Sequence, residues 1–288
     1  MENIKAIFID LDGTLVGHDG IVHEDSINVL NELKNRGIKI VISTGRNYHQ
    51  ARKIVGEIEG VYYITNNGAY VVDDKGEVIS SRELNNRKLL DLIDEILQFK
   101  KMYFFVQNHE IIVTNSTLWD RYRNAFSSTS LLKLFSLDNL KAFFHRETTI
   151  GTKIKYLEMP RDYFITNENK WLKILVTGNK KGIDYLADKY KKAFNISFSH
   201  SSNIEINEFG VSKGQAIKEF CEFHKISLKD TMCFGDSGND IEMFKAVGIP
   251  VVMANSEVKE LHKISKFKAD HYNNQGVAKF LKEKFDIK

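Results

Sequence analysis

Two acidic residues lie close together near the start of the chain, in the run Asp10-Leu11-Asp12-Gly13-Thr14-Leu15. They follow an apolar stretch, residues 4–9, that is typical of a buried strand. In a continuing strand the two side chains would point to opposite faces, but Gly13 indicates that the chain has turned. Both carboxylates can then face one crevice, where the first can attack phosphorus and the second can give and take a proton. An Asx-type turn is the structural alternative, and the whole run at a strand end disfavours it.

A second acidic cluster has the sequence Gly235-Asp236-Ser237-Gly238-Asn239-Asp240 and follows a strand-like run at residues 231–234. By itself it could be an N-cap whose acidic residues favour the helix dipole. Two acidic clusters at strand ends of one parallel sheet, however, would form a hard, oxygen-rich site. Such a site suits Mg²⁺ with a substrate phosphate, because the carboxylates would otherwise repel one another and the substrate.

Two further segments offer what a phosphate needs. Ser43-Thr44-Gly45-Arg46 ends the second strand-like run and is expected to present a hydroxyl and backbone N–H groups at a helix start. Thr44 as a simple N-cap is the alternative for this tetrad. Lys213 stands where another helix begins, and the helix dipole disfavours a cation there. This misfit favours a functional charge over a solvated lysine.

The composition excludes several other classes of protein. A net charge of +3 over 288 residues, without a basic stripe, argues against nucleic-acid binding. The two cysteines argue against a disulfide framework, and the nine histidines lack the spacing of a zinc site. No nucleophile elbow surrounds Ser201-Ser202, and no glycine loop of the nucleotide-binding kinds follows the first strand. Without a leader or a membrane-length apolar run, we expect no membrane contact and a cytoplasmic location.

The elements that must position these residues form two patterns. Apolar runs at residues 4–9, 38–43, 231–234 and 249–253 alternate with helical patterns, including those at 256–264 and 275–285. Continuous apolar runs followed by helices suit parallel strands buried on both faces. The sequence therefore predicts a doubly wound α/β core made of two pieces, residues 1–82 and 201–288.

Between the two pieces, residues 83–200 follow a different pattern. A helix is predicted over 86–99 with strands at 102–107 and 110–114, and a second helix over 180–194 with strands at 196–199 and 204–207. Two such α-β-β units would make one small sheet with helices on one side. We therefore expect an inserted α+β cap domain, within which residues 117–169 show the weakest pattern.

Taken together, these motifs resemble the haloacid dehalogenase-superfamily phosphatases of the Cof type, which carry a large α/β cap in the class IIB arrangement. The resemblance spans nearly the whole chain and depends on the order and spacing of several short motifs. Besides the two acidic clusters and the 43–46 tetrad, they are Asn67-Gly68-Ala69, Val211-Ser212-Lys213-Gly214, Met253-Ala254-Asn255, Ala269-Asp270 and Gly276-Val277.

The resemblance implies a role for each candidate residue. Asp10 would be the nucleophile and Asp12 the general acid and then base, while Thr44 and Lys213 hold the phosphoryl oxygens. Mg²⁺ would lie among Asp10, the Asp12 carbonyl and Asp236, with Asp240 acting through water or as a supporting partner. The substrate set comprises Thr44, Gly45, Arg46, Asn67, Lys213, Asn239 and Asn255, of which Asn239 orients neighbouring groups and Arg46, Asn67 and Asn255 line the entrance.

The sequence thus predicts a Mg²⁺-dependent phosphatase that acts on a small phosphorylated metabolite. Sugar phosphates are the first choice of substrate, and flavin mononucleotide and pyridoxal phosphate are alternatives within the family. A phosphomutase or phosphotransferase of the same fold would share the early chemistry but release little inorganic phosphate. A phospho-acceptor signalling module is a further alternative, and Asp12 together with a large insert argues against it, because a regulatory phospho-aspartate needs no substrate lid.

Overall fold

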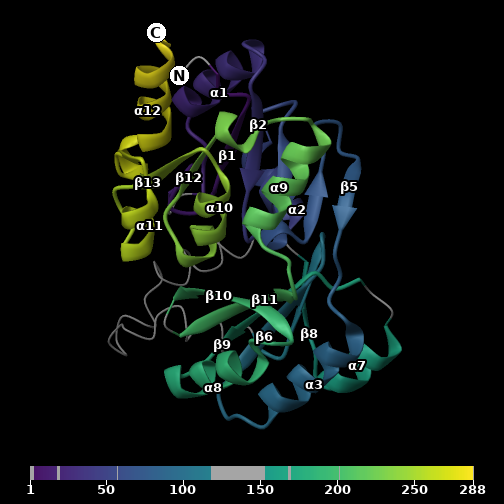
Figure 1. Ribbon diagram of the computed structural model, residues 1–288. Helices are drawn as coiled ribbons and strands as arrows, with labels where there is room; N and C mark the ends of the chain where they lie inside the picture. Colours follow the sequence, from purple (N-terminus) through teal and green to yellow (C-terminus); the bar gives the residue numbers. More distant parts are fainter. Residues whose placement is uncertain are drawn as a thin grey trace, which may run out of the picture.

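The computed structural model describes residues 3–17, 20–56, 58–117, 153–167, 170–200 and 202–287. Within these residues, the larger of two sheets has eight strands in the order β14-β13-β12-β1-β2-β3-β4-β5 (Figure 1). Neighbours from β14 to β3 run parallel, and β4 and β5 are antiparallel additions at one edge. The strands are β1 (Ala6–Ile9), β2 (Lys39–Ser43), β3 (Tyr62–Thr65), β4 (Tyr70–Val72), β5 (Val78–Ser81), β12 (Thr231–Gly235), β13 (Ile249–Met253) and β14 (Phe267–Ala269).

Helices cover both faces of this sheet, because its central strands are apolar on both sides. Ile7 and Ile9 of β1 pack in a cluster with α1 (Glu24–Asn35), α2 (Tyr48–Val55) and α12 (Gly276–Phe285). The alternate residues Ala6 and Phe8 pack in another cluster with α9 (Lys213–Phe223), α10 (Ile241–Ala246) and α11 (Lys259–Ile264). The predicted doubly wound α/β core is therefore confirmed. Short 3₁₀ turns complete it: η1 (Asn66–Gly68), η2 (Leu228–Asp230), η3 (Gly238–Asp240) and η4 (Tyr272–Asn274).

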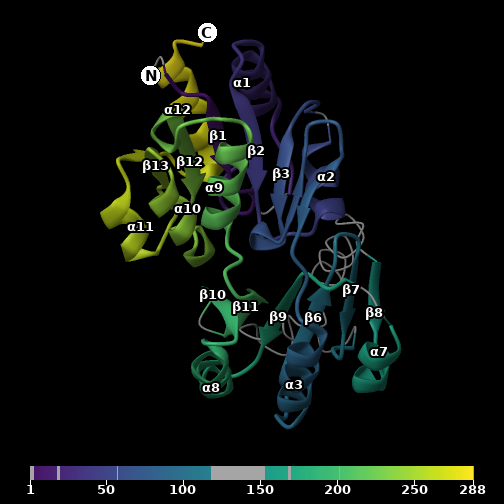
Figure 2. The ribbon, with the colours of Figure 1, turned by 45° about the vertical axis from the view of Figure 1, so that its right-hand side comes forward.

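The smaller sheet has the strand order β10-β11-β9-β6-β7-β8. Its strands are β6 (Tyr103–Gln107), β7 (Ile111–Thr114), β8 (Lys153–Tyr156), β9 (Lys173–Thr177), β10 (Phe194–His200) and β11 (Asn203–Glu208). Among the described residues, three helices contribute apolar side chains to one shared core with this sheet: α3 (Asn86–Leu97), α7 (Pro160–Thr166) and α8 (Lys180–Tyr190). The helices lie on the side of the sheet that faces away from the larger domain (Figures 1 and 2).

The smaller domain also shows where the sequence patterns were incomplete. The helix predicted over 180–194 ends at Tyr190, since Phe194 already begins β10. Strand β11 pairs with β9 and β10, so the smaller sheet continues beyond the predicted boundary at residue 200. Strands β8 and β9 were not predicted. Residues 118–152, 168 and 169, in the segment with the weakest pattern, lie outside the described residues, as does Ser201.

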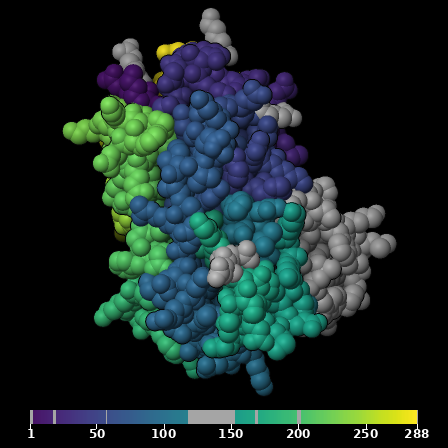
Figure 3. Space-filling view, turned by 90° about the vertical axis from the view of Figure 1, so that its right-hand side faces the viewer, coloured from purple at the N-terminus to yellow at the C-terminus, as the bar shows by residue number. Residues whose placement is uncertain are grey.

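The second face of the smaller sheet is turned toward the larger domain (Figure 2), and on the side seen in Figure 3 the two domains lie directly against each other. Side chains alternate along a strand, so Ile174 and Val176 of β9 enter the small-domain core while Lys173 faces the opposite way. Likewise, Ile204 and Ile206 of β11 enter that core, which leaves Glu205 and Asn207 for the interface. In the described part of the chain, no helix combines the length and apolarity needed to cross a membrane.

Candidate active site

The loop after β1 carries the first acidic pair. Asp10 directly follows the strand and its side chain is buried, whereas Asp12 is exposed. Gly13, which directly follows Asp12, adopts a φ of +78°, and a side chain there would collide with the carboxylate of Asp236. Glycine is thus required at this turn for both its backbone conformation and its lack of a side chain.

The second loop, after β2, brings Thr44, Gly45 and Arg46 to the same edge of the sheet. Helix α2 begins only at Tyr48, and its N-cap is Asn47, which forms a capping box with Gln50. The expected helix start at the 43–46 tetrad is therefore corrected: Ser43 ends β2, and residues 44–46 form a loop before the helix. Thr44 is not the N-cap, so its hydroxyl is free of that role.

Arg46 links this loop to the first one. Its Nε and Nη2 atoms donate to the two carboxylate oxygens of Asp12, at 2.7 and 2.6 Å. Such a two-point contact fixes the orientation of both groups as well as pairing their charges. In this arrangement the exposed Asp12 side chain is fixed beside Arg46.

Lys213 is the first residue of α9, and the structure explains the misfit with the helix dipole. Its ammonium group is fully buried and donates to Asp10 Oδ1 at 2.7 Å and to Asp240 Oδ1 at 2.6 Å. Burial alone would lower the pKa of Lys213, but the charges of Asp10 and Asp240 raise it above its ordinary value. A lysine that would be unfavourable by helix position is thus held as a cation between two carboxylates.

In the second acidic cluster, one side chain accepts hydrogen bonds from the backbone of the same loop. Asp240 is buried, and its Oδ2 accepts from the N–H groups of Asp236 and Ser237, both at 3.0 Å. The carboxylate of Asp236 accepts from Thr14 Oγ1 at 3.2 Å and from Asn255 Nδ2 at 3.1 Å. Asp240 therefore shapes the loop that carries Asp236, and Asp236 faces the first loop.

Three carboxylates meet at this edge of the sheet. Single oxygens of Asp10, Asp236 and Asp240 lie within 4.8 Å of one another. Burial, together with Asp240, raises the pKa of Asp236 to about 7. Burial also raises the pKa of Asp10 well above its ordinary value; Lys213 opposes that shift, and Asp240 and Asp236 add to it. Three carboxylates therefore gather around Lys213 at this place, and such a set of oxygen donors fits a hard divalent cation.

The three asparagines predicted for the substrate set lie at different places. Asn67 is buried, has a φ of +58°, and its Oδ1 accepts from Asn239 Nδ2 at 3.2 Å. Asn239 in turn accepts from Ser237 Oγ at 2.6 Å. Asn255 lies beside the acidic loops, where its Nδ2 donates to the Gly13 carbonyl at 2.8 Å as well as to Asp236. Asn255 thus braces the junction of the two acidic loops.

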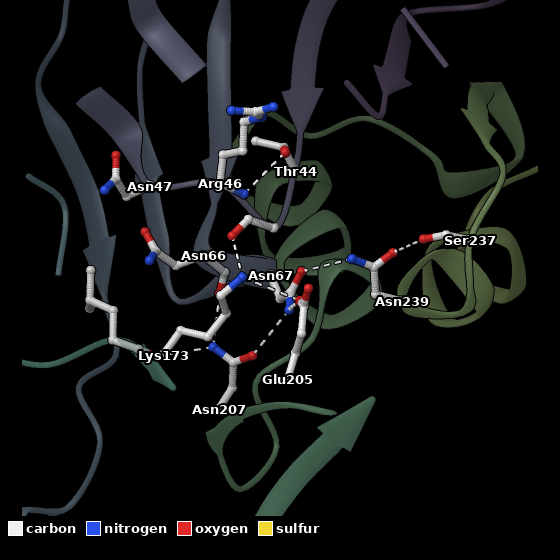
Figure 4. Close-up of polar contacts among 12 residues, drawn as sticks. Thr44, Arg46, Asn47, Asn66, Asn67, Lys173, Glu205, Asn207, Ser237 and Asn239 are labelled. Atoms are coloured by element: carbon white, nitrogen blue, oxygen red, sulfur yellow. Dashed lines mark hydrogen bonds and ion pairs between the residues drawn. The ribbon is translucent and has the colours of Figure 1, made fainter. Parts of the chain in front are cut away.

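The cap-side sheet adds residues that the sequence reasoning did not identify. Lys173 Nζ donates to the Gly45 carbonyl and pairs with Glu205 Oε2 at 3.2 Å (Figure 4). Glu205 also accepts from Asn67 Nδ2, and Asn207 Nδ2 donates to the carbonyl of Asn66 at 2.8 Å. Burial by itself would raise the pKa of Glu205, yet Lys173 and Asn67 hold it below its ordinary value. A signal was present for Lys173, because it opens a strand that is apolar over the next three residues. Strand β11 alternates polar and apolar residues, so its pattern did not distinguish Glu205.

The fold and this strand-end cluster define a doubly wound α/β protein with a crowded acidic site whose oxygen donors could hold a cation. The model of the haloacid dehalogenase-like hydrolase family matches residues 7–281. A relative from Buchnera aphidicola is 30% identical over 250 residues, covering 86% of this chain and 85% of that protein. The 5-amino-6-(5-phospho-D-ribitylamino)uracil phosphatase of Bacillus subtilis is 27% identical, covering 97% of this chain and 95% of its own.

Solved structures agree on the fold. A haloacid dehalogenase-like hydrolase from B. subtilis superposes with a TM-score of 0.85 at 24% identity, covering 97% of this chain and 99% of that one. The chain belongs to the haloacid dehalogenase-like hydrolase family, and the resemblance drawn from its motifs is confirmed.

Proposed function

We propose that the protein is a Mg²⁺-dependent phosphatase that hydrolyses small phosphorylated metabolites through a phospho-aspartate on Asp10. The observation that carries the proposal is the placement of Asp10. It is a buried carboxylate at a strand end, paired with a buried lysine and set among further carboxylates. A purely structural aspartate has no need of such crowding, whereas a nucleophile that must meet a phosphate dianion requires cations around it.

In the proposed reaction, an Asp10 oxygen attacks phosphorus as the bond to the ester oxygen breaks. Asp12, which takes up a proton from solvent once Arg46 has left it, gives that proton to the ester oxygen. Asp12 then takes a proton from water, which attacks the phospho-aspartate and releases phosphate with Asp10 regenerated. Lys213 holds Asp10 in place and, with the Thr44 hydroxyl, faces the phosphoryl oxygens. Because Arg46 now occupies both oxygens of Asp12, we infer that an incoming phosphate draws Arg46 toward itself and frees Asp12.

The metal would be held by Asp10, Asp236 and the carbonyl of Asp12. When bound, Mg²⁺ neutralises the charge of the phosphate and of the carboxylates around it. Asp240 is better suited to support than to direct contact, because its oxygens already accept from Lys213 and from the backbone of Asp236 and Ser237. Asn255 would keep Asp236 aligned through its amide.

We assign the choice of substrate to the cap, predicted as residues 83–200 and continued in the structure by β11. Polar residues of its sheet contact the loops that carry Arg46 and Asn67, and Asn239 is hydrogen-bonded to Asn67. Sugar phosphates are the proposed class, and one relative is named for a substrate with a phosphorylated ribityl chain, which is a polyol phosphate. A polar interface of amides and charges suits a leaving group with several hydroxyls better than it suits an apolar leaving group.

The test is a screen for inorganic phosphate release from a panel of phosphomonoesters. The panel should contain sugar and polyol phosphates, flavin mononucleotide, pyridoxal phosphate and an aryl phosphate, each with Mg²⁺. We expect release from at least one polyol or sugar phosphate with a kcat/KM above that for the aryl ester. If no monoester releases phosphate, or if phosphate appears only on a second sugar, the hydrolase assignment is wrong.

Replacing Asp12 by asparagine should slow hydrolysis according to the leaving group. An alkoxide needs a proton to depart, so a sugar phosphate should lose about 10²- to 10⁴-fold in kcat. An aryl phosphate, whose phenolate leaves without help, should lose much less in its first step. Pre-steady-state measurement of that step on both substrates checks this. Equal losses on the two esters would rule out proton transfer by Asp12.

A further inference from the structure

The loop of Thr44, Gly45 and Arg46, called the phosphate loop below, is held in place by contacts from both domains. Its three consecutive carbonyls, of Thr44, Gly45 and Arg46, each accept one hydrogen bond. Core backbone supplies the first and the third, from the N–H groups of Asn67 at 3.1 Å and Asn66 at 2.9 Å. The middle carbonyl, of Gly45, accepts from the side chain of Lys173 on the cap strand β9 (Figure 4). Only the middle contact would be lost if the cap moved away.

The Gly45 carbonyl belongs to the same peptide group as the Arg46 N–H. That N–H donates to Thr44 Oγ1 at 3.1 Å. A hydroxyl that already accepts has its single proton left to donate, and among the described residues the Thr44 hydroxyl is seen only as the acceptor of this bond. The orientation of one peptide therefore decides where the Thr44 proton points. Because the peptide follows a glycine, its rotation is opposed less than elsewhere in the chain.

The surroundings of Gly45 show that this contact is built into the fold. A Cβ on Gly45 would lie 3.0 Å from Asn67 Oδ1, 3.1 Å from Glu205 Oε2 and 3.2 Å from Lys173 Nζ. The side chains of Lys173 and Glu205 are only 4% and 11% exposed, so the pair is buried with its charges matched. Burying an ammonium group is costly unless it is paired and hydrogen-bonded, and here the Gly45 carbonyl accepts one of its hydrogen bonds.

We propose that Lys173 is a positioning residue for catalysis: from the cap, it fixes the Gly45–Arg46 peptide so that the Thr44 hydroxyl donates toward the substrate phosphate. The inference rests on the proposed phosphatase function and adds a coupling between the docked cap and the phosphate site. It differs from a substrate-selecting role, because the phosphate is common to every substrate. Lys173 acts through the loop and need not touch the leaving group.

The decisive variants are Lys173→Met and the double variant Lys173→Met with Glu205→Gln, which removes the buried charge left behind by the single change. We expect both to lower kcat about 10-fold or more, by the same factor on a sugar phosphate and on an aryl phosphate, with KM little changed. The conservative Lys173→Arg should recover part of the loss. Lys189→Met is the matched control, since it breaks a cap Lys–Glu pair far from the loop and should leave kcat unchanged.

A double-mutant cycle with Thr44→Val tests the route of the effect. If Lys173 acts through the Thr44 hydroxyl, adding Lys173→Met to Thr44→Val should cause little further loss. Additive losses, different factors on the two esters, or an unchanged kcat in the double variant with Glu205→Gln would each overturn the proposal.

Amide exchange gives a readout that does not depend on turnover. The Arg46 N–H should exchange about 10-fold faster in the double variant than in the wild type or Lys189→Met, because its peptide loses the restraint. Unchanged exchange would contradict the inference even if the enzyme were slower. If the proposed phosphatase function were wrong, the wild type would release no phosphate, and that result is distinct from unchanged amide exchange in the double variant.

Discussion

Replacing Asp10 by asparagine is expected to reduce turnover by at least about 10⁴-fold, because an amide cannot form the phospho-enzyme and no other group takes over a lost nucleophile. The substitution keeps the size of the side chain, and Lys213 retains its contact with Asp240. It also removes one negative charge from a crowded group of carboxylates. The variant should therefore stay folded, and its thermal unfolding midpoint is the control for this.

Asp12→Asn is the matched comparison, since it changes the same residue type two positions away. It should keep measurable hydrolysis of an aryl phosphate, while Asp10→Asn should not. Borohydride reduction of the wild type during turnover converts an aspartyl phosphate to homoserine, which mass spectrometry can locate. We expect the mark at residue 10. A mark at Asp12, Asp236 or Asp240, or full activity of Asp10→Asn, would show that the nucleophile has been misassigned.

The sequence could predict which acidic residues meet at the strand ends of the core, because the signals for them are local in the sequence. An apolar run sets the strand, the residue after it lies at the edge of the sheet, and a glycine marks the turn. Asp10 after β1 and Asp236 after β12 follow this rule, and the two strands are direct neighbours. Their meeting thus needs only the parallel pairing that the apolar runs already indicate.

The start of α2 shows a local signal that was overlooked. Asn47 followed three residues later by Gln50 is the pattern of a capping box, and it places the helix start after the 43–46 tetrad. This capping box predicts that Thr44 lies in a loop before the helix. Its hydroxyl would then have been available for a ligand from the outset.

Contacts between the domains could not be predicted in the same way. Lys173 meets Gly45 across 128 positions of sequence, and Glu205 meets Asn67 across 138. Nothing in a strand pattern states which loop will lie opposite a given face of a separate sheet. The pattern does show a lysine at the start of an apolar strand. If such a lysine is buried it needs a buried partner, and the sequence does not say which residue provides it.

The metal requirement follows from the balance of charge at the site. Asp10, Asp236 and Asp240 gather against a single buried ammonium group, and the pKa of Asp236 is raised to about 7 by burial and by Asp240. A phosphate dianion brought to this place would add to the excess of negative charge. On the proposed function, the site would need a cation before it can accept its substrate, and its oxygen donors would select a hard divalent ion.

Removing the metal with a chelator should lower activity by about 10³-fold or more, since a bound cation contributes several kcal/mol of charge stabilisation, and Mg²⁺ should restore it. Mg²⁺ should also raise the thermal unfolding midpoint, because it binds the folded state. Asp236→Asn should abolish both responses. Asp230→Asn is the matched control, since Asp230 precedes the strand that Asp236 follows and so lies at its opposite end. Full turnover in excess chelator, or an undiminished thermal response in Asp236→Asn, would refute the metal role given to this carboxylate.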